Sequence, residues 1–406
     1  MPPGDLVPSR PVVRPGSLLA RLGAAPRIVV LRGGRLGDFL VATPALRALR
    51  LARPEAQITL VTAAAVAPLA ARYPWFQEVL AAPPAPGIAP GPEDPGAQER
   101  FLAALRARAF DLAVQLNGGG TTANRFLRQM GARWTVGCQA PDAEPLDLGL
   151  PFVREEHEVL RYLGVVRALG VETGDVRLAL PVFPEDEQAL RALPGLDPAL
   201  LAERRSLGVH LGSLSGARRW PVGHFATVLR ALHQDWPWPV VVLGRAEDRP
   251  LARALRACLD DAPWLLDLTG QTTLGVLAAL IGRLRLLLTT DSAPAHMATA
   301  LGTPSVVIFG SGNPHNWAPL ERMWHRPVAD WQAPCRWAPG ACGCPDDARA
   351  RCLAAVTPAM VLQAARDLLA TLERVRPPAW EAGASSACSS RRGARCAWTT
   401  SAPTPA

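Results

Sequence analysis

Short apolar segments rich in β-branched residues alternate along this chain with segments of helical character. The first of them, residues 27–32 (RIVVLR), runs directly into Gly33-Gly34 and then into a segment of helix-forming residues. A strand followed by a turn and a helix is the repeating unit of a parallel sheet, because parallel neighbours need a crossover connection. The pattern therefore predicts an α/β protein with doubly wound parallel sheets.

The alternation comes in two series, which predicts two domains. In the first we expect strands at 27–32, 57–62 and 111–116 and a helix at 38–51. In the second we expect strands at 207–211, 239–243, 264–268, 284–289 and 305–309, with helices at 224–234, 274–282 and 357–375. Four prolines within residues 180–205 mark the connection, so the domains are placed at 27–185 and 186–375. Residues 1–26 and 376–406 are rich in Pro, Gly, Ser, Ala and Arg and are expected to be disordered.

The net charge is +8, and five of these charges lie in the terminal segments, +2 in residues 1–26 and +3 in residues 376–406. The remaining charge of about +3 on residues 27–375 does not predict a nucleic-acid surface, but it is compatible with an anionic substrate or an acidic membrane face. No apolar run approaches the roughly 18 residues of a membrane span, and Arg21 interrupts the stretch 17–25 that would otherwise suggest a signal peptide. We therefore expect a cytoplasmic protein.

The first candidate motif is the glycine-rich turn after the first expected strand. Gly34 and Gly37 allow a sharp turn and a close approach to a ligand, and the start of the next helix favours negative charge. Asp38 lies at this helix start, and on position alone it is interpreted as a helix cap. The G-x-G-x-x-G spacing of a dinucleotide-binding loop is absent, so the motif by itself is a weak cofactor signal.

A second candidate motif, HLGSLSGARRWP at 210–221, follows the first strand of the second series. Ser213 and Ser215 offer hydroxyl groups, while Arg218 and Arg219 offer guanidinium groups that suit phosphate oxygens. Ligands bind to α/β sheets outside the carboxyl ends of the strands, which is where this segment is expected. The alternative is a solvated basic loop.

The third candidate motif is TTDSAPAHMATALGTP at 289–304. Asp291 and Ser292 are helix-capping residue types, Pro294 fits the first helical turn, and Gly302 fits the end of the helix. The free N–H groups of such a helix start can bind a pyrophosphate. His296 could add a donor there, although a single histidine at this position is also commonly structural.

Two further features have alternative interpretations. Glu247 follows another expected strand and is either a surface acid or an acceptor of hydrogen bonds from a ribose. Half of the eight cysteines crowd into a short segment with the spacing C-x6-C-x-C-x7-C: Cys335, Cys342, Cys344 and Cys352. Four thiolates can bind a structural zinc ion, but C-x-C differs from the usual C-x2-C. A redox-sensitive pair and plain reduced thiols therefore remain open.

Taken together, these motifs resemble glycosyltransferase family 9, the heptosyltransferases of lipopolysaccharide core assembly. The likeness rests on GGRLGDFLVATPALRAL (33–49), HLGSLSGARRWPVGHF (210–225) and TTDSAPAHMATALGTPSVVIFG (289–310), of which the third is quite specific. Asn313-Pro314 and Trp317-Ala318-Pro319 continue it, as does the cysteine-rich segment. The resemblance runs from about residue 27 to residue 372, which is nearly all of the part expected to fold.

The resemblance implies a GT-B fold, in which two Rossmann-like domains face each other across a cleft. The domain at 27–185 would lie on the acceptor side, and the domain at 186–375 would bind a nucleotide-sugar donor. The implied reaction is an inverting, metal-independent transfer of a heptose-type sugar from ADP-heptose to a hydroxyl of a lipopolysaccharide-core-like glycan or glycolipid. No cofactor or nucleic acid is implied, and peripheral contact with the inner membrane face is compatible with such an acceptor.

The resemblance also assigns the chemistry to two residues. Asp38 would be the general base, and Arg218 would neutralise the departing diphosphate. Relatives usually have lysine where this chain has Arg218. All 43 basic residues here are arginine, so we interpret Arg218 as a charge-preserving replacement with a different donor geometry.

The remaining family positions bind substrates. Glu247 corresponds to the acid that binds the nucleotide ribose, and Asp291 to the residue that binds the donor sugar. The other assigned positions are Ser292, Ala293 and His296 on the pyrophosphate-binding turn, Ser213 and Ser215 as further phosphate contacts, and Gly34 and Gly37 on the acceptor-side loop.

Other functions share parts of this pattern. A nucleotide-binding oxidoreductase has the same alternation, but here the dinucleotide fingerprint is missing and the phosphate motifs lie in the second half. A nucleotide-sugar epimerase of the same fold would turn over the donor without an acceptor. A relative that uses another nucleotide sugar and a non-catalytic nucleotide-binding relative also remain, although the retention of Asp38, Glu247 and Asp291 argues against the last.

Overall fold

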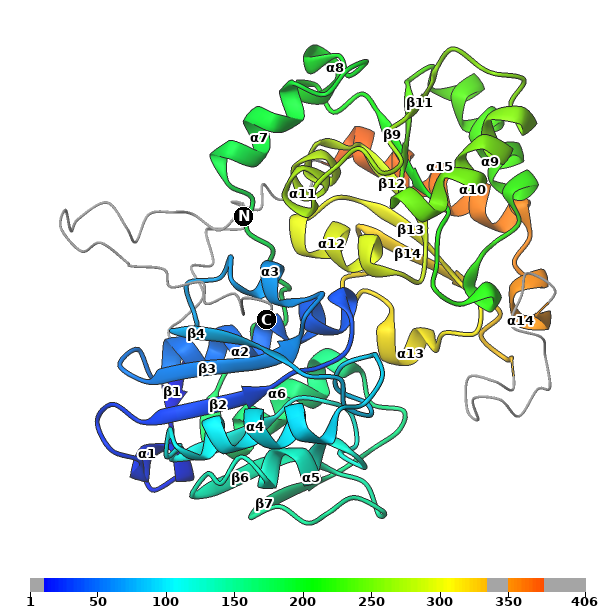
Figure 1. The fold of residues 1–406 in the computed structure, drawn as a ribbon. Helices are drawn as coiled ribbons and strands as arrows, with labels where there is room; N and C mark the ends of the chain where they lie inside the picture. The colour runs from blue at the N-terminus through cyan, green and yellow to red at the C-terminus, as the bar shows by residue number, and fades with distance from the viewer. Residues whose placement is uncertain (1–10, 334–349, 376–406) are drawn as a thin grey trace.

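The chain folds into two lobes, each built around a parallel sheet with helices on both faces (Figure 1). This computed structural model describes residues 11–333 and 350–375. The first lobe contains the N-terminal half of the chain and the second lobe the C-terminal half, so the predicted α/β class and the two parallel sheets are confirmed.

The first lobe contains a six-stranded sheet. Its strands are β2 (Arg27–Leu31), β3 (Gln57–Ala63), β4 (Glu78–Ala82), β5 (Leu112–Gln115), β6 (Trp134–Gln139) and β7 (Leu148–Pro151). Their order is β4-β3-β2-β5-β6-β7, and every neighbouring pair is parallel. The helices are α2 (Leu36–Ala52), α3 (Ala67–Ala70), α4 (Pro95–Arg106), α5 (Ala123–Arg128) and α6 (Glu158–Ala168).

The second lobe repeats this architecture. Its strands are β9 (Leu207–His210), β10 (Val240–Leu243), β11 (Leu265–Asp267), β12 (Leu286–Thr290), β13 (Ser305–Phe309) and β14 (His325–Ala329), in the order β11-β10-β9-β12-β13-β14. The α-helices are α7 (Pro184–Arg191), α8 (Pro198–Ala202), α9 (Val222–Asp235), α10 (Arg249–Cys258), α11 (Leu274–Arg283), α12 (Ala293–Leu301), α13 (Pro314–Trp317), α14 (Arg351–Ala354) and α15 (Pro358–Arg374). Two short 3₁₀ turns are η1 (Gly216–Arg218) and η2 (Ala246–Asp248).

The central strands are apolar along most of their length because both of their faces are covered. In β2 the residues from Ile28 to Leu31 are fully buried, and β10 (VVVL) is buried throughout. Helices such as α11 and α15 place their apolar sides against these sheets. None of the described helices is both long and apolar enough to cross a membrane.

The strand orders define where each sheet can bind a ligand. In each lobe the first strand of the sheet lies in the interior of the sheet. The next two strands in sequence lie on one side of it, and the later strands lie on the other side. The order therefore reverses between β2 and β5 in the first lobe and between β9 and β12 in the second. Loops at the carboxyl ends of strands that flank such a reversal form the binding crevice of doubly wound sheets.

The N-terminal segment differs from the sequence-based expectation. Residues 1–26 were expected to be disordered, but residues 11–26 include β1 (Val12–Val13) and α1 (Leu18–Arg21). Strand β1 pairs antiparallel with β8 (Val171–Glu172), and Leu19 is fully buried in the core of the first lobe. The few apolar residues within this Pro- and Gly-rich stretch are sufficient to hold it against the first lobe. Residues 1–10 and 376–406 lie outside the described residues.

Several elements were not predicted. Strand β7 (LGLP) contains glycine and proline, which weaken a strand signal and fit an edge position. Strand β4 (EVLAA) has a single β-branched residue. The boundary proposed between residues 185 and 186 falls inside α7, whose body packs against α11 and whose Glu187 pairs with Arg283 at 3.0 Å.

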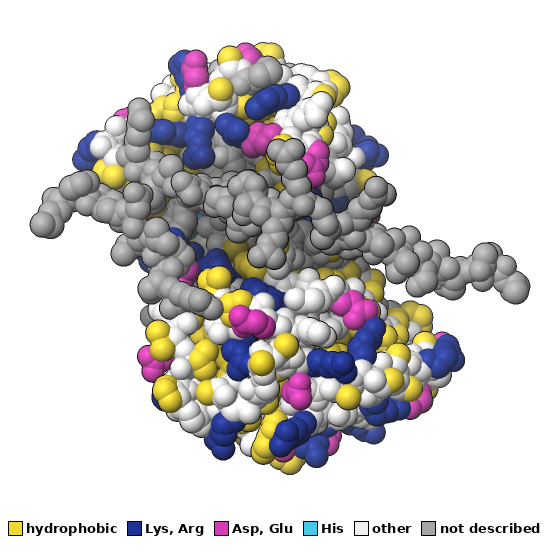
Figure 2. Space-filling model, turned by 90° about the vertical axis from the view of Figure 1, so that its left-hand side faces the viewer, with side chains coloured by type: hydrophobic (Ala, Val, Ile, Leu, Met, Phe, Trp, Pro, Cys, Tyr) yellow, Lys and Arg dark blue, Asp and Glu magenta, His cyan; other side chains and the backbone are white. Residues whose placement is uncertain are grey.

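Charged side chains are mixed over the surface. In Figure 2 the visible arginine side chains are spread over both lobes and are interspersed with acidic ones. On the described residues of this face they do not form one continuous basic stripe.

Candidate active site

Asp38 lies in the first turn of α2, directly after the loop that follows β2. Its Oδ2 accepts a hydrogen bond from the backbone N–H of Arg35 at 2.7 Å, and its Oδ1 lies 3.6 Å from Nη2 of Arg32. The side chain is 26 % exposed. Asp38 is therefore not the N-cap that its position suggested: Arg35 is the N-cap, and Asp38, the third residue of the helix, reaches back to the backbone N–H of Arg35 while its carboxylate stays open to solvent on one side.

Arg32 fixes the position of this carboxylate, and sequence reasoning gave it no such role. Its Nε donates to the backbone oxygen of Asp38 at 2.8 Å, and its Nη1 donates to Oδ1 of Asn117, at the end of β5, at 3.2 Å. Its guanidinium lies 5.0 Å from the ring centroid of Tyr162, and only 4 % of the side chain is exposed. An arginine at the end of an otherwise apolar strand was the signal available in the sequence.

Two glycines allow the tight contacts around Asp38. Gly34 has a φ of +86°, which favours glycine, and a Cβ there would lie 2.7 Å from Oδ2 of Asp38. A Cβ on Gly37 would lie 2.7 Å from Cδ2 of His296, which belongs to the second lobe. Helix α2 packs directly against α12, and Gly37 is a position where the first motif and the third motif come close together.

The N-terminus of α12 faces this contact. Ser292 is the residue that precedes the helix, its side chain does not cap the helix, and its Oγ lies 3.3 Å from Nδ1 of His210. Ala293 begins the helix, Pro294 has no N–H, and the N–H of Ala295 donates to the carbonyl of Ser292 at 3.0 Å, which leaves the N–H of Ala293 as the open donor of this first turn. His296 is buried, which lowers its pKa, while the carboxylates of Asp291 and Asp38 oppose this shift. His296 thus lies within electrostatic range of acidic groups from both lobes.

Arg218 and Asp291 form the charged centre of the second lobe. Arg218 Nη1 lies 3.3 Å from Oδ2 of Asp291, and the two side chains are 34 % and 5 % exposed. The Nε of Arg218 is buried and donates no hydrogen bond within the described part of the chain. Arg218 therefore retains an unused donor beside the start of α12, where an anion would be attracted.

The loop after β9 holds Arg218 in place. Ser213 Oγ accepts from the backbone N–H of Ser215 at 3.4 Å, and its carbonyl accepts from Nε of Arg219 at 2.8 Å. Thr290 Oγ1 donates to the carbonyl of Gly212 at 3.2 Å, which ties this loop to β12. Both predicted serines are half-buried members of a loop that flanks the strand-order reversal.

Glu247 lies apart from this charged pair on η2. Its side chain is 72 % exposed and lies 3.9 Å from Nε of Arg245. The next residue, Asp248, is buried, accepts from the backbone N–H of Arg245 at 3.0 Å and would lie 2.4 Å from a Cβ on Gly212. Sequence reasoning missed Asp248, although an acid directly before a helix that starts Arg-Pro was a capping signal.

The cysteine-rich segment falls mostly outside the described residues. Cys335, Cys342 and Cys344 lie there, and only Cys352, buried in α14, is described. Among residues 11–333 and 350–375, no group of three or more His, Cys, Asp or Glu side chains is placed to bind a metal ion. The zinc hypothesis for the four cysteines remains a prediction.

Buried neutral histidines predict how the fold responds to acid. Burial lowers the pKa of His157 and His210 to about 4 and that of His325 to about 3, from an ordinary value of 6.5. Unfolding restores the ordinary value, so below pH 6.5 the unfolded chain binds more protons and stability falls as the pH drops towards 4. At about 1.4 kcal/mol per unit for each group, the unfolding free energy at pH 5 should be roughly 4–6 kcal/mol below that at pH 7.

Chemical denaturation at pH 7, 6 and 5 measures this effect. The matched variant is His325→Gln, whose amide can still bond to Ser305, the partner of His325 Nδ1 at 2.8 Å. Its loss of stability between pH 7 and pH 5 should be smaller by at most about a third, because one of the three histidines with the largest shifts is gone while His296, whose pKa burial also lowers, remains. Equal unfolding free energies at pH 7 and pH 5 would contradict the prediction.

The fold and the site together define a class of protein. Two doubly wound lobes meet where α2 packs against α12, and one contributes an accessible carboxylate while the other contributes a helix start beside an arginine. This is the GT-B arrangement of glycosyltransferases that use nucleotide sugars. A model of one family, described as glycosyltransferase family 9 (heptosyltransferase), matches residues 99–338. The chain belongs to glycosyltransferase family 9 and is a heptosyltransferase-like glycosyltransferase.

Individual relatives agree with this assignment. Lipopolysaccharide heptosyltransferase 2 of Salmonella typhimurium is 28 % identical over 305 residues, which cover 72 % of this chain and 85 % of that protein. The crystal structure of a family 9 glycosyltransferase from Veillonella parvula has a TM-score of 0.68 at 22 % identity, covering 86 % of this chain and 99 % of that one. E. coli ADP-heptose LPS heptosyltransferase II has a TM-score of 0.67 with the same identity and coverage. The structural similarities confirm the GT-B fold.

Proposed function

We propose that this protein transfers a heptose-type sugar from ADP-heptose to a hydroxyl of a lipopolysaccharide-core-like acceptor, with inversion at the anomeric carbon and without a required metal ion. The similarity to LPS heptosyltransferase 2 and to ADP-heptose LPS heptosyltransferase II supports the donor and the acceptor class. The observation that carries the proposal is the meeting of α2 and α12, which places Asp38 opposite the helix start beside Arg218.

The donor would be bound by the second lobe. The start of α12, with the N–H of Ala293 and the positive end of the helix dipole, and the unused Nε of Arg218 would bind the diphosphate, together with Ser292 and His296. Asp291 would bind the sugar hydroxyls, and its pairing with Arg218 would orient both side chains. Further donor contacts are assigned to Ser213 and Ser215 for phosphate and to the exposed Glu247 for ribose.

Asp38 would act as the general base. As the acceptor hydroxyl attacks the anomeric carbon, its proton would pass to the open oxygen of the Asp38 carboxylate. The diphosphate would leave on the opposite side, toward the second lobe, so the anomeric configuration would invert. Negative charge that develops on the diphosphate would be stabilised by Arg218 and the helix start, which are already in place before the reaction.

These groups also support a reaction that needs no metal. A departing diphosphate must be neutralised, and a guanidinium with a free donor beside a helix N-terminus can supply the positive charge. The net charge of +8 would further favour contact with the acidic inner face of a membrane, where a glycolipid acceptor would be found. This contact would be peripheral, with the protein in the cytoplasm.

A transfer assay tests the proposal. The protein is incubated with ADP-heptose and a heptose-deficient lipopolysaccharide core, with and without EDTA, and the anomeric configuration of the product is determined by NMR. We expect acceptor-dependent transfer with inversion, equal with and without EDTA, and slower or absent with UDP- or GDP-sugars. Donor turnover without acceptor would indicate an epimerase instead, and ADP binding without any turnover would indicate a non-catalytic relative.

A further inference from the structure

A second contact between the lobes lies beside the α2–α12 contact. Asn316 on α13 donates through Nδ2 to the backbone carbonyls of Arg154 and Glu156, both at 2.7 Å. His157, just before α6, bonds through Nε2 to the backbone oxygen of Ala318 at 2.8 Å. We call these side chains and carbonyls the polar latch. Asn316 and His157 are both buried, so their hydrogen bonds are shielded from water.

The hydrogen bonds of the latch leave little freedom to either side chain. His157 Nδ1 accepts from the backbone N–H of Val159 at 3.2 Å, so Nε2 must carry the proton and donate to Ala318. Asn316 directs both of its amide protons at carbonyl oxygens of the first lobe. Each lobe thus contributes one buried side chain that bonds to the backbone of the other.

The latch is connected to both halves of the candidate active site. On the donor side, α13 follows the loop of Gly312, where a Cβ would lie 1.9 Å from Oδ2 of Asp291. On the acceptor side, His157 precedes α6, which packs along α2, the helix that carries Asp38. A shift of α13 against α6 would therefore change the distance between Asp38 and the donor-binding residues.

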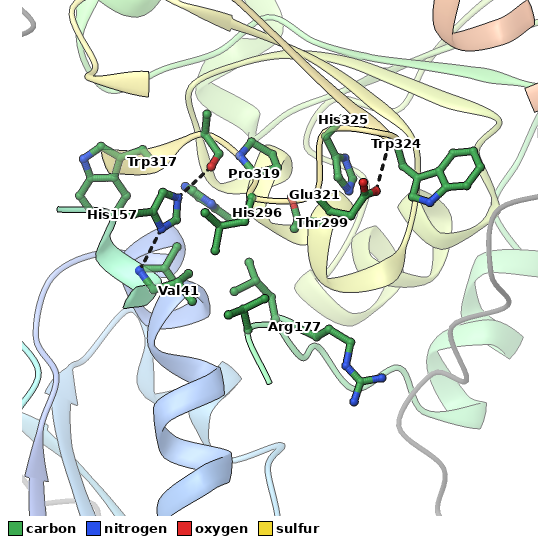
Figure 3. A pocket seen from close by; sticks show the side chains of 15 residues that line it. Val41, His157, Arg177, His296, Thr299, Trp317, Pro319, Glu321, Trp324 and His325 are labelled. Carbon is green, nitrogen blue, oxygen red and sulfur yellow. Dashed lines mark hydrogen bonds between the residues drawn. The ribbon is translucent and has the colours of Figure 1, made fainter. Parts of the chain in front are cut away.

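A cavity of about 110 Å³ adjoins the latch. Figure 3 shows His157, His296 and Trp317 grouped at one end of it, with the hydrogen bonds of His157 drawn as dashed lines. Val41 of α2 lines the same space, so both lobes form its wall. Because side-chain packing is incomplete around this cavity, the hydrogen bonds of the latch add to the packing of α2 against α12 in setting the spacing of the lobes.

We propose that Asn316 and His157 are positioning residues, which hold the lobes at the separation that transfer from the donor to the acceptor requires. The inference rests on the proposed function for its catalytic consequence, but the separation of the lobes can be measured independently. Neither residue needs to touch a substrate for this role. Misplacement of reacting groups by about 1 Å can cost roughly 100-fold in rate, so a modest opening would have a large effect.

The test compares three latch variants with a surface control. Asn316→Ala and His157→Ala remove the bonds, and Asn316→Asp keeps the side-chain volume but places a carboxylate against two carbonyls. The control is Glu155→Ala, which alters an exposed side chain between the two residues whose carbonyls Asn316 binds. We expect kcat to fall about 10- to 100-fold in the latch variants, with the Kd for ADP within about twofold of wild type. His157→Gln, which can donate from a similar position, should recover part of the rate.

Small-angle scattering with saturating ADP provides the readout that does not depend on turnover. The latch variants should show a larger radius of gyration than wild type, and Glu155→Ala should not. A latch variant with unchanged kcat and unchanged radius of gyration would overturn the proposal, as would a loss of rate explained by weaker ADP binding. If the wild-type protein transfers no sugar, the proposed function fails, while the scattering comparison still decides whether the latch holds the lobes.

Discussion

Asp38→Asn is expected to lower the rate of sugar transfer by about 10²- to 10⁴-fold, the usual range for loss of a general base. The amide cannot take the proton of the acceptor hydroxyl. Its oxygen can still accept the backbone N–H of Arg35, which Asp38 accepts at 2.7 Å, so the start of α2 should remain intact. The rate is measured as transfer from ADP-heptose to the heptose-deficient core, and the affinity for ADP by titration calorimetry. ADP affinity should be unchanged, because Asp38 belongs to the acceptor side.

The first lobe provides a matched control in Asp111. Its Oδ2 accepts the backbone N–H of Arg27 at 2.8 Å, just before β5 and at the end of the sheet opposite the active-site loops. Asp111→Asn makes the same chemical change in a similar structural role. It should leave transfer near the wild-type rate. Near-normal transfer by Asp38→Asn, or an equal loss in Asp111→Asn, would disprove the assignment of Asp38 as the base.

The buried strands could be predicted because their surroundings are uniform. A parallel strand covered on both faces must be apolar along its length, so β2, β9, β12 and β13 have clear local signals. The edge strands β4 and β7 have weaker composition signals and were missed, and so was the interior strand β6 (WTVGCQ), whose run contains a glycine and polar residues. Strand β1 was missed because two valines in a Pro- and Gly-rich segment are stabilised only by their distant partner, β8.

The candidate site could be predicted where its signal is local. The glycine turn before Asp38 and the capping residues before α12 are read from short stretches of sequence. The proximity of Gly37 and His296 could not be predicted, because it depends on how two separately folded lobes dock. The bonds of Asn316 could not be predicted either. They go to backbone carbonyls of the other lobe, and every residue has such a carbonyl whatever its side chain.

Arg218→Ala is expected to weaken binding of ADP and of the donor by about 1.5–3 kcal/mol, which is the range for loss of a charge-assisted hydrogen bond. This corresponds to roughly a 10- to 150-fold higher Kd, which titration calorimetry measures directly. The physical reason is the unused Nε of Arg218, which is buried beside the helix start that would bind the diphosphate. The transfer rate should fall further than binding does, because negative charge on the diphosphate grows in the transition state.

A structural contribution of Arg218 must be separated from this role. Arg218 pairs with Asp291, which is 5 % exposed, so its removal leaves a buried carboxylate without its partner and should also lower stability. Adding Asp291→Asn to Arg218→Ala should restore thermal stability without restoring ADP affinity. Recovery of ADP affinity in the double variant would show that Arg218 acts only by holding Asp291.

Two further variants complete the comparison. Arg366→Ala removes an exposed arginine of the same lobe, which pairs with Asp235 at 2.7 Å, and should change ADP affinity little. Arg218→Lys keeps the charge but lacks the planar fork of donors, so it should recover only part of the affinity. If Arg218→Lys binds ADP as tightly as wild type, charge alone is sufficient at this position, and arginine stands there only because this chain uses no lysine. If Arg218→Ala itself binds ADP normally, the diphosphate is bound elsewhere.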